Sequence, residues 1–482
     1  MSLFKNLNMK YKKICDRILI LTFYFFLFLY TLLFSLITIN RYLQYEVFYY
    51  DFGIFERAIY LMSQFKIPII DHYILTDKIS FADHFNPSLI LISLIYKILP
   101  KPEFLLFLQV LFVSLSGYMI FLIGKEISKN LTFSVFLSLS YLFFIGTQNA
   151  LIADFHAITL SNLFYALFVY FYLKSDFKKF LVSYLIFLGF KEHLFIAGVL
   201  TLLSLWLFKN QWKKKLMLTS LLSIAYGIIV IKILMPFLSG KFYLYSPEFP
   251  GSPKEILLRF FTPKEKIKTL LFSFASFGFL PIINLKFYPP VLSDFFVRFV
   301  PENTQGRWGL GLHSSIQSAI LLATSAALSF PILKKWIKRG LILNIFTIII
   351  FTFSILLNLK KRPPIILGLI PDFYRNTKNF KFLNELVDQI PRQCSVMTQN
   401  NLLPHLTHNK KIWMLRKNYK SFSPDTIILD LRPGQNPSNF WPLKETDLLK
   451  IKKKLDKDKS YKLYYSTKEQ FIYTKIGSRC IK

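Results

Sequence analysis

The sequence predicts an α-helical polytopic membrane protein that ends in a small extracytoplasmic α/β domain. Hydrophobic residues make up 53% of the 482 residues, and they gather in blocks of roughly 20 residues rather than in alternating patterns. A helix that is apolar on every side suits the bilayer, because its backbone polar groups are bonded within the segment. With half-length helices included, the blocks predict about eleven crossings. We assign residues 1–358 to the membrane domain and 359–482 to the soluble domain.

Positive charge marks the cytoplasmic side. The formal net charge of +33 would indicate nucleic-acid binding in a soluble protein, but here lysine and arginine cluster between apolar blocks, as they do in cytoplasmic loops. The clusters are KEISKN (125–130), KSDFKK (174–179), KNQWKKK (209–215) and KKWIKR (334–339). We therefore predict a multi-pass protein of the cell (inner) membrane, with a cytoplasmic N-terminus and no nucleic-acid partner.

The first apolar segment, 18–39, follows a basic stretch, as a secretory signal would. It is too long for a signal and has no small-residue cleavage site, so we interpret it as an uncleaved first span. A long outer loop follows at 40–103, and its stretch 87–99 is typical of a helix lying at the membrane interface. Further spans are predicted at 104–124, 131–147, 158–173, 216–238, 314–333 and 341–358, outer loops at 239–266 and 301–313, and short Pro-rich helices at 267–299.

One apolar run contains charged residues. Between the basic clusters at 179 and 209 only Lys191, Glu192 and His193 interrupt it, and the chain must go out and back within this length. Two half-length helices that meet at the triplet would leave both basic clusters on the cytoplasmic side. Such irregular backbone is tolerated only against protein or a water-filled cavity.

The tail becomes polar after LKKRPP and carries short β-type runs such as CSVMTQ, KIWML and TIILDL, which with the amphipathic stretches between them indicate an α/β domain. Cys394 and Cys480 lie in this tail and can pair if it is extracytoplasmic. His405 and His408 fall in a predicted loop, where a surface position without chemistry is expected.

Polar residues of interest concentrate in the outer loops and at the outer ends of spans. Asp51 and Glu56 in YYDFGIFERAIY are candidate catalytic carboxylates: either can serve as a general base, or can only cap a juxtamembrane helix. The pairs Asp71-His72 and Asp83-His84 offer carboxylate and imidazole ligands. A divalent metal such as Mg or Mn, with Asp83 and His84 as candidate ligands, competes with the simpler reading of solvated loop residues.

The charged triplet is the strongest signal, because ionisable groups within an apolar run are costly unless they line a polar site. Lys191 can hold a phosphate while Glu192 keeps it charged and oriented; the alternative is a buried ion pair between helices. For Asp154 an ion-paired helix start is an equal explanation. The candidate residues for binding a substrate or a lipid phosphate are His84, Asp154, His156, Lys191, Glu192, His193, Arg307 and His313.

These motifs resemble a membrane family known as domain of unknown function 2079. The resemblance rests on the Asp-x-Gly of YDFGIFERAIY, the His-x-x-Pro of HFNPSL, the DFH at 154–156, the KEH triplet and His313, and it extends through CSVMTQNNLLPHLTHNKKIWML and TIILDLRP in the tail. That family in turn resembles the GT-C superfamily of integral membrane glycosyltransferases, which use polyprenyl-phosphate sugars on the outer leaflet.

The resemblance implies a GT-C-like fold and transfer of a hexosyl or pentosyl group from a polyprenyl-phosphate carrier to a glycan, lipid or protein acceptor. It implies that Asp51 is the general base, that HFNPSLILISLIYKILPK forms the interface helix, and that LGFKEH is the break in a span. The pattern departs from many GT-C enzymes, because Asp51 is followed by Phe52 and not by a second acid.

Two other functions fit the same sequence. A flippase or transporter of lipid-linked glycans would place its ionisable residues near the bilayer midplane and would show internal repeats, whereas here these residues sit towards the outer surface and no repeat is visible. A non-catalytic membrane assembly factor, whose tail binds a partner, is the third reading.

Overall fold

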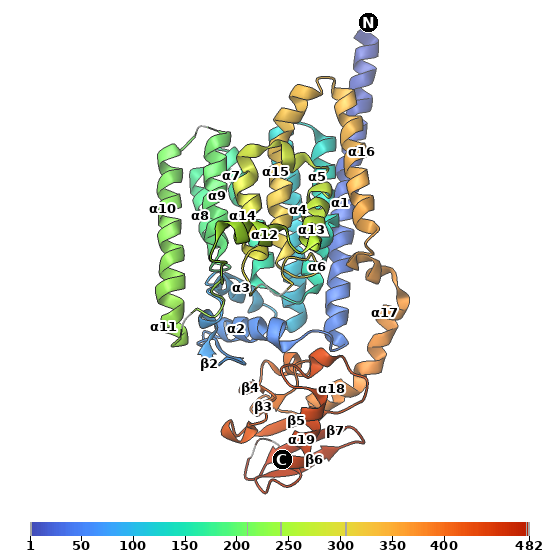
Figure 1. Ribbon diagram of the computed structural model, residues 1–482. Coiled ribbons are helices and arrows are strands. Elements are labelled where there is room, and N and C mark those ends of the chain that lie inside the picture. The colour runs from blue at the N-terminus through green and yellow to red at the C-terminus, as the bar shows by residue number, and fades with distance from the viewer. Residues whose placement is uncertain (1, 210, 242, 304–305, 479, 481–482) are drawn as a thin grey trace.

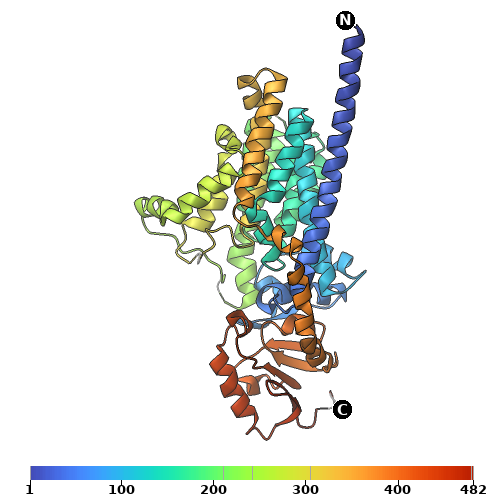
Figure 2. The same ribbon diagram turned by 90° about the vertical axis from the view of Figure 1, so that its right-hand side faces the viewer.

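A computed structural model describes residues 2–209, 211–241, 243–303, 306–478 and 480. A bundle of long helices stands above a small domain formed by the C-terminal part of the chain, and the two termini lie at opposite ends of the molecule (Figures 1 and 2). The elements of the first outer loop lie between the bundle and this tail domain (Figure 1).

Five described helices are long and apolar enough to cross a membrane, and a bent helix pair makes a sixth candidate. The five are α1 (Ser2–Leu43), α4 (Pro102–Ser128), α10 (Lys213–Ile229, continued by Val230–Leu234 and by α11, Met235–Ser239), α15 (Ser315–Trp336) and α16 (Gly340–Leu359). The apolar windows of α15 and α4 are 89% and 72% buried, whereas those of α1, α10 and α16 are only 22% buried. The first two therefore form the centre of the bundle, and the others turn their apolar surface to lipid.

Shorter helices lie at the positions of the other predicted crossings. The bent pair is α5 (Leu131–Phe143) and α6 (Ile145–Ile152), with an angle of 45° between them, and α7 (Ala157–Leu173) follows. The broken span is confirmed: α8 (Phe177–Leu188) and α9 (Leu194–Phe208) are separated at the predicted triplet. The Pro-rich region forms α13 (Lys264–Ala275), two 3-10 turns (Leu280–Ile283 and Leu285–Phe287) and α14 (Tyr288–Phe299).

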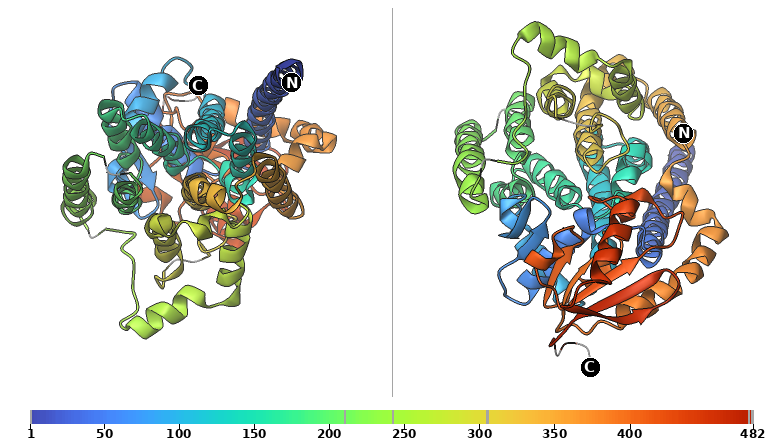
Figure 3. Two further views of the ribbon diagram at one scale, coloured as in Figure 1. Left: turned by 90° about the horizontal axis from the view of Figure 1, so that it is seen from above. Right: turned by 60° about the horizontal axis from the view of Figure 1, so that its bottom comes forward.

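The first outer loop is compact. It contains a π-helical turn at Tyr49–Gly53, α2 (Ile54–Ser63), an antiparallel hairpin of β1 (Ile69–His72) and β2 (Leu75–Ile79), a 3-10 turn at Ser80–Ala82, and α3 (Leu89–Tyr96). The exposed apolar side chains of α3 include Ile90, Leu91 and Leu94, as expected for a helix at the interface. In the second outer loop α12 (Pro253–Phe261) has no buried residue and stands apart from the tail domain (Figure 3).

The tail domain is an α/β fold, as predicted. Its sheet has the order β4-β3-β5-β7-β6, in which β3 is parallel to β4 and β5 and the remaining pairs are antiparallel. The strands are β3 (Ser395–Thr398), β4 (Lys411–Met414), β5 (Thr426–Asp430), β6 (Tyr461–Ser466) and β7 (Gln470–Lys475). The helices are α17 (Pro371–Arg375), α18 (Lys381–Asp388) and α19 (Glu445–Leu455). Short 3-10 turns occupy Pro364–Leu369, Asn376–Phe380, Leu403–Leu406, Tyr419–Ser421 and Pro437–Asn439. Cys394 and Cys480 form a disulfide, which the sequence analysis left open as a possibility.

Buried charges dock the tail domain onto the first outer loop. Arg57 of α2 donates hydrogen bonds to the carbonyls of Thr407 (2.6 Å) and Asn409 (2.7 Å). Asp71 of β1 lies 2.5 Å from the Arg416 guanidinium and accepts a 2.8 Å bond from the Met414 N–H. A buried charge is stable only when it is paired and hydrogen-bonded, so these contacts fix the domain in one position.

The docking overturns two expectations from the sequence. His405 is not at the surface: its ring stacks between Tyr42 and Tyr45, with centroid distances of 4.1 and 3.9 Å. His408 stacks on Tyr60 at 3.7 Å and is only 12% exposed. The sequence places both in a loop, and the fold presses that loop against the first outer loop. Asp71, His72 and Asp83 are likewise buried rather than solvated.

Replacing the buried cation of this interface should destabilise the protein. We expect Arg416→Ala to lower the free energy of unfolding by about 3–5 kcal/mol, because Asp71 stays buried without its partner. The matched control is Lys411→Ala, which removes an exposed ion pair with Asp77 across the same interface and should cost less than about 1 kcal/mol. Unfolding of purified protein in detergent, followed by circular dichroism, measures both; equal losses would contradict the docking role of Arg416.

Candidate functional site

Glu192 occupies the centre of the candidate site. It lies in the break between α8 and α9, is fully buried, and accepts hydrogen bonds from His84 Nδ1 (3.0 Å), the Phe85 N–H (3.2 Å) and the Tyr243 hydroxyl (2.8 Å). These donors come from the first and second outer loops. One carboxylate therefore joins the broken span to both loops.

The close approach of Gly189 makes this junction possible. The Gly189 carbonyl accepts a 2.8 Å bond from the Ser88 N–H, and a Cβ at position 189 would lie 2.3 Å from Ser88 Oγ. A larger residue would push the start of α3 away from the end of α8. His84 and Phe85 would then move away from Glu192.

Asp51 and two histidines meet beside this junction. Asp51, in the π-helical turn, has a side chain that is 46% exposed, and its Oδ1 lies 3.4 Å from Nε2 of the buried His156. The His156 ring stacks on His313 with a centroid distance of 3.5 Å. Burial, and next the neighbouring His156, lower the pKa of His313 well below its usual range. The arrangement thus presents an accessible carboxylate that is backed by imidazoles.

Asp154 binds the backbone at the start of the turn that carries Asp51. Its Oδ2 accepts a 3.0 Å bond from the Phe48 N–H, and its Oδ1 lies 3.6 Å from the Arg41 guanidinium. Burial raises the pKa of Asp154 to about 7, although Arg41 opposes the shift. Asp154 therefore holds the loop that carries Asp51, in agreement with the ion-paired alternative for this residue.

Lys191 and Arg307 are the cations of the site, and they lie within electrostatic range of each other. Lys191 is within electrostatic range of Glu192, Arg307, Asp83 and Asp51, and His193 is within range of Lys191, Glu192 and Arg307. Arg307 is exposed on the third outer loop. An anion that enters between the loops would meet these positive charges.

The third outer loop is held by a buried ion pair that the sequence analysis did not identify. Arg298 of α14 lies 3.3 Å from Asp294 and donates to the carbonyls of Arg307 (3.2 Å) and Gly309 (3.4 Å). Asp294 and Arg298 are four residues apart in one helix, and this spacing could have indicated the ion pair from the sequence. This pair fixes the backbone that carries Arg307 and His313.

Asp83 and His84 turn to different partners. Asp83 accepts a 2.6 Å bond from the Tyr245 hydroxyl and lies 3.6 Å from His72 Nε2, whereas His84 faces Glu192. Among the described residues no group of three or more His, Cys, Asp or Glu side chains is placed to hold a metal ion. A divalent metal stays a prediction, and it would need ligands from the substrate as well.

Glu56 lies apart from Asp51. It is fully buried, lies 2.7 Å from His408 Nε2 and accepts a 2.5 Å bond from the Tyr96 hydroxyl. Its partners belong to the tail domain and to α3, so the structure places Glu56 in the docking interface. Its catalytic role, like the other roles assigned above, stays a prediction.

Sequence reasoning missed the tyrosines of the site. Tyr243 bonds Glu192, and the Tyr245 ring stacks on His84 with a centroid distance of 4.4 Å. Both lie in a turn that is closed by a 3.2 Å hydrogen bond from the Ser246 N–H to the Tyr243 carbonyl, and no local pattern in the sequence marks them as site residues.

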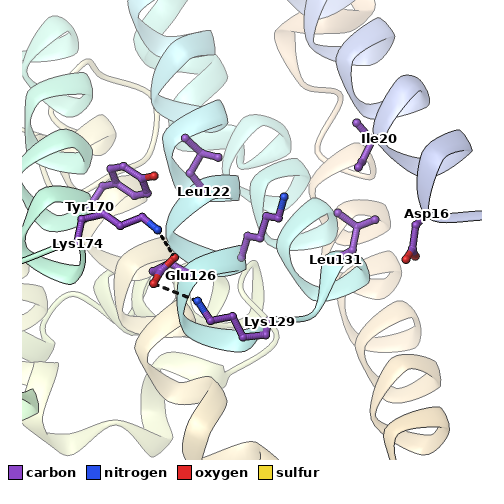
Figure 4. A pocket seen from close by; sticks show the side chains of 9 residues that line it. Asp16, Ile20, Leu122, Glu126, Lys129, Leu131, Tyr170 and Lys174 are labelled. Atoms are coloured by element: carbon purple, nitrogen blue, oxygen red, sulfur yellow. Dashed lines mark hydrogen bonds and ion pairs between the residues drawn. The ribbon is translucent and has the colours of Figure 1, made fainter. Parts of the chain in front are cut away.

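A cavity of about 480 Å³ lies at the other end of the helices, among Asp16, Lys125, Glu126, Lys129 and Lys174 (Figure 4). Glu126 is already paired with Lys129 (3.0 Å) and Lys174 (2.6 Å). The cavity contains none of the candidate residues, and it does not form part of the site described above.

The fold is shared with solved structures. It matches a crystal structure of ArnT from Cupriavidus metallidurans bound to undecaprenyl phosphate with a TM-score of 0.55 and 8% sequence identity, over 95% of this chain and 98% of that chain. The same protein in the apo state matches with a TM-score of 0.51 and 9% identity, over 88% and 93% of the two chains. ArnT is a GT-C glycosyltransferase, and this chain shares its fold.

The model of a family described as "Predicted membrane protein (DUF2079)" matches residues 44–470 of this chain. The chain belongs to this family, as its motifs predicted. No curated protein sequence matches it.

The raised pKa of Asp154 predicts a pH-dependent stability. A carboxyl that binds its proton more tightly when folded stabilises the protein at low pH, and this contribution is lost as pH rises towards 7. Between pH 5 and pH 8 the loss from Asp154 should be about 2–3 kcal/mol. Asp154→Asn should remove it, and asparagine tolerates the positive φ of 58° at this position.

Thermal unfolding at the two pH values measures this effect. The control is Asp372→Asn, whose side chain is 85% exposed and which should leave the pH dependence of wild type unchanged. The raised pKa of Asp154 would be contradicted if the wild-type protein became more stable between pH 5 and pH 8 and if the stability of Asp154→Asn changed with pH in the same way.

Proposed function

We propose that the protein is an integral membrane glycosyltransferase that moves a sugar from a polyprenyl-phosphate carrier to an extracytoplasmic acceptor, with Asp51 as the general base. The observation that carries the proposal is an accessible carboxylate, Asp51, that is backed by His156 and lies within electrostatic range of Lys191, which is itself within range of Arg307. The GT-C fold supports it, since ArnT of the same fold was crystallised with undecaprenyl phosphate.

The chemistry requires a base and a group that stabilises the leaving phosphate. The acceptor hydroxyl oxygen attacks the anomeric carbon of the donor while its proton passes to the Asp51 carboxylate. The bond between the anomeric carbon and the phosphate oxygen breaks, and its electron pair stays on the phosphate. Lys191 and Arg307 stabilise the charge that develops there, and His156 orients Asp51.

The broken span explains how a lipid-linked donor reaches these residues. The sugar and phosphate of the donor lie at the membrane surface, while its chain stays in the bilayer. A site built at the break between half-helices, under outer loops, receives the head group and leaves the chain in lipid. Among the described residues the ionisable groups of this site lie at helix ends and in outer loops, which favours surface chemistry over a pathway through the membrane.

Replacing Asp51 tests the proposal. With purified protein in nanodiscs and a panel of radiolabelled polyprenyl-phosphate sugars, we expect transfer by wild type and a fall in kcat/KM of about 100- to 10,000-fold in Asp51→Asn, because a general base contributes this much. The control is Asp77→Asn, an exposed carboxylate of the same loop that pairs with Lys411; it should retain full activity. Absence of transfer by wild type, with labelled lipid crossing between leaflets, would show a flippase instead.

We also propose that the tail and the outer loops face away from the cytoplasm. The basic clusters and the disulfide support this orientation. Cys15 is a free, exposed cysteine near the N-terminus. In intact cells a membrane-impermeant maleimide should fail to label Cys15 and should label Lys462→Cys, an exposed position on β6. Labelling of Cys15 before permeabilisation would reverse the orientation.

A further inference from the structure

Two exposed aromatic side chains and a half-buried one lie together where the tail domain meets the first outer loop. We call Tyr50, Tyr73 and Trp441 the aromatic shelf. The Trp441 ring lies 4.0 Å from that of Tyr50 and 6.1 Å from that of Tyr73. Tyr73 is 40% exposed and Trp441 is 39% exposed. Such exposure of large apolar rings, in contact with each other and beside a charged site, is typical of a binding surface.

Asn400 holds the two halves of the shelf together. Its carbonyl and its side-chain oxygen accept hydrogen bonds from the N–H groups of Tyr49 (2.9 Å) and Tyr50 (3.0 Å). Its own N–H donates to the Asn439 carbonyl (3.1 Å), and its side-chain amide donates to the Ser438 carbonyl (3.0 Å). One buried asparagine therefore fixes the turn that carries Tyr50 against the tail loop that carries Trp441.

Tyr73 is positioned by the same interface. It lies in the turn between β1 and β2, and the Arg416 guanidinium lies 5.2 Å from the centre of its ring. Arg416 is itself held by Asp71. Buried polar contacts thus hold the backbone that carries Tyr50 and the tail loop that carries Trp441, and Tyr73 lies against a buried cation.

The shelf adjoins the candidate site. Tyr50 precedes Asp51 in the chain, and it lies within electrostatic range of Asp83, Asp51 and Arg307. A molecule that rests on Trp441 and Tyr73 can therefore extend past Tyr50 to the Asp51 carboxylate.

We propose that the aromatic shelf is the acceptor subsite and that the acceptor is a carbohydrate. A pyranose ring has an apolar face of C–H groups that packs on an aromatic face, while its hydroxyls remain free for hydrogen bonds and for attack on the donor. The charge around the shelf is mixed, which suits a ring with many hydroxyls. This inference rests on the proposed function, because it names the substrate that Asp51 deprotonates.

The test is carbohydrate binding by the full-length protein in nanodiscs, without donor, on a printed array of neutral and acidic oligosaccharides. We expect wild type to bind a group of related oligosaccharides, Trp441→Ala to bind them about tenfold more weakly, and Trp441→Phe to keep most of the affinity. The matched controls are Tyr464→Ala, an exposed aromatic on β6 (44%), and Trp336→Ala at the end of α15 (64%). Both should bind as wild type does.

The proposed acceptor subsite would be contradicted if wild type bound no oligosaccharide, or if wild type and Trp441→Ala bound oligosaccharides equally well. Weaker binding in Trp441→Ala with retained affinity for undecaprenyl phosphate supports it, because a misfolded protein would lose both. If Asp51→Asn transfers sugar as well as wild type, the proposed base fails while the shelf stands. If transfer depends on Asp51 but Trp441→Ala leaves the acceptor KM unchanged, the acceptor subsite is contradicted while the proposed base stands.

Discussion

The hydrogen bonds to Glu192 are the constraint on which the outer face of the protein depends. A carboxylate that is fully buried at a break between helices must be satisfied on all sides, and its donors can come only from chain that folds back over the break. His84 and Phe85 of the first outer loop and Tyr243 of the second supply them. The need to satisfy one charge therefore determines where two loops settle.

The bilayer brings together residues that are far apart in the chain. Helices that cross a layer of fixed thickness must end near common planes, so the loops that join their outer ends meet each other. Asp51, His156 and His313 become neighbours in this way, although a first loop, a helix start and a late loop carry them. Local motifs identified these residues one by one, but their meeting in one site is a property of the whole bundle.

The sequence predicted the features that depend on local energetics and failed at those that depend on docking. The break at Lys191–His193 was predictable because ionisable groups in an apolar run must have a reason to be there, and the long spans were predictable from composition. The burial of His405 and the pairing of Glu56 with His408 were not, because the latter residues are 352 positions apart and nothing local indicates that a polar tail loop is pressed against α2. Tyr243 was missed for a similar reason: its partner lies across the site.

The tail domain is part of the site and not only a cover. The N–H groups of Tyr49 and Tyr50 are bonded to Asn400, and these residues form the turn in which Asp51 stands. Backbone groups that are buried without partners are costly, so the turn keeps its shape only while the tail is docked. Arg57 and Asp71 are held in the same interface. The position of Asp51 and the attachment of the soluble domain are therefore coupled, since each requires the buried contacts that make the other.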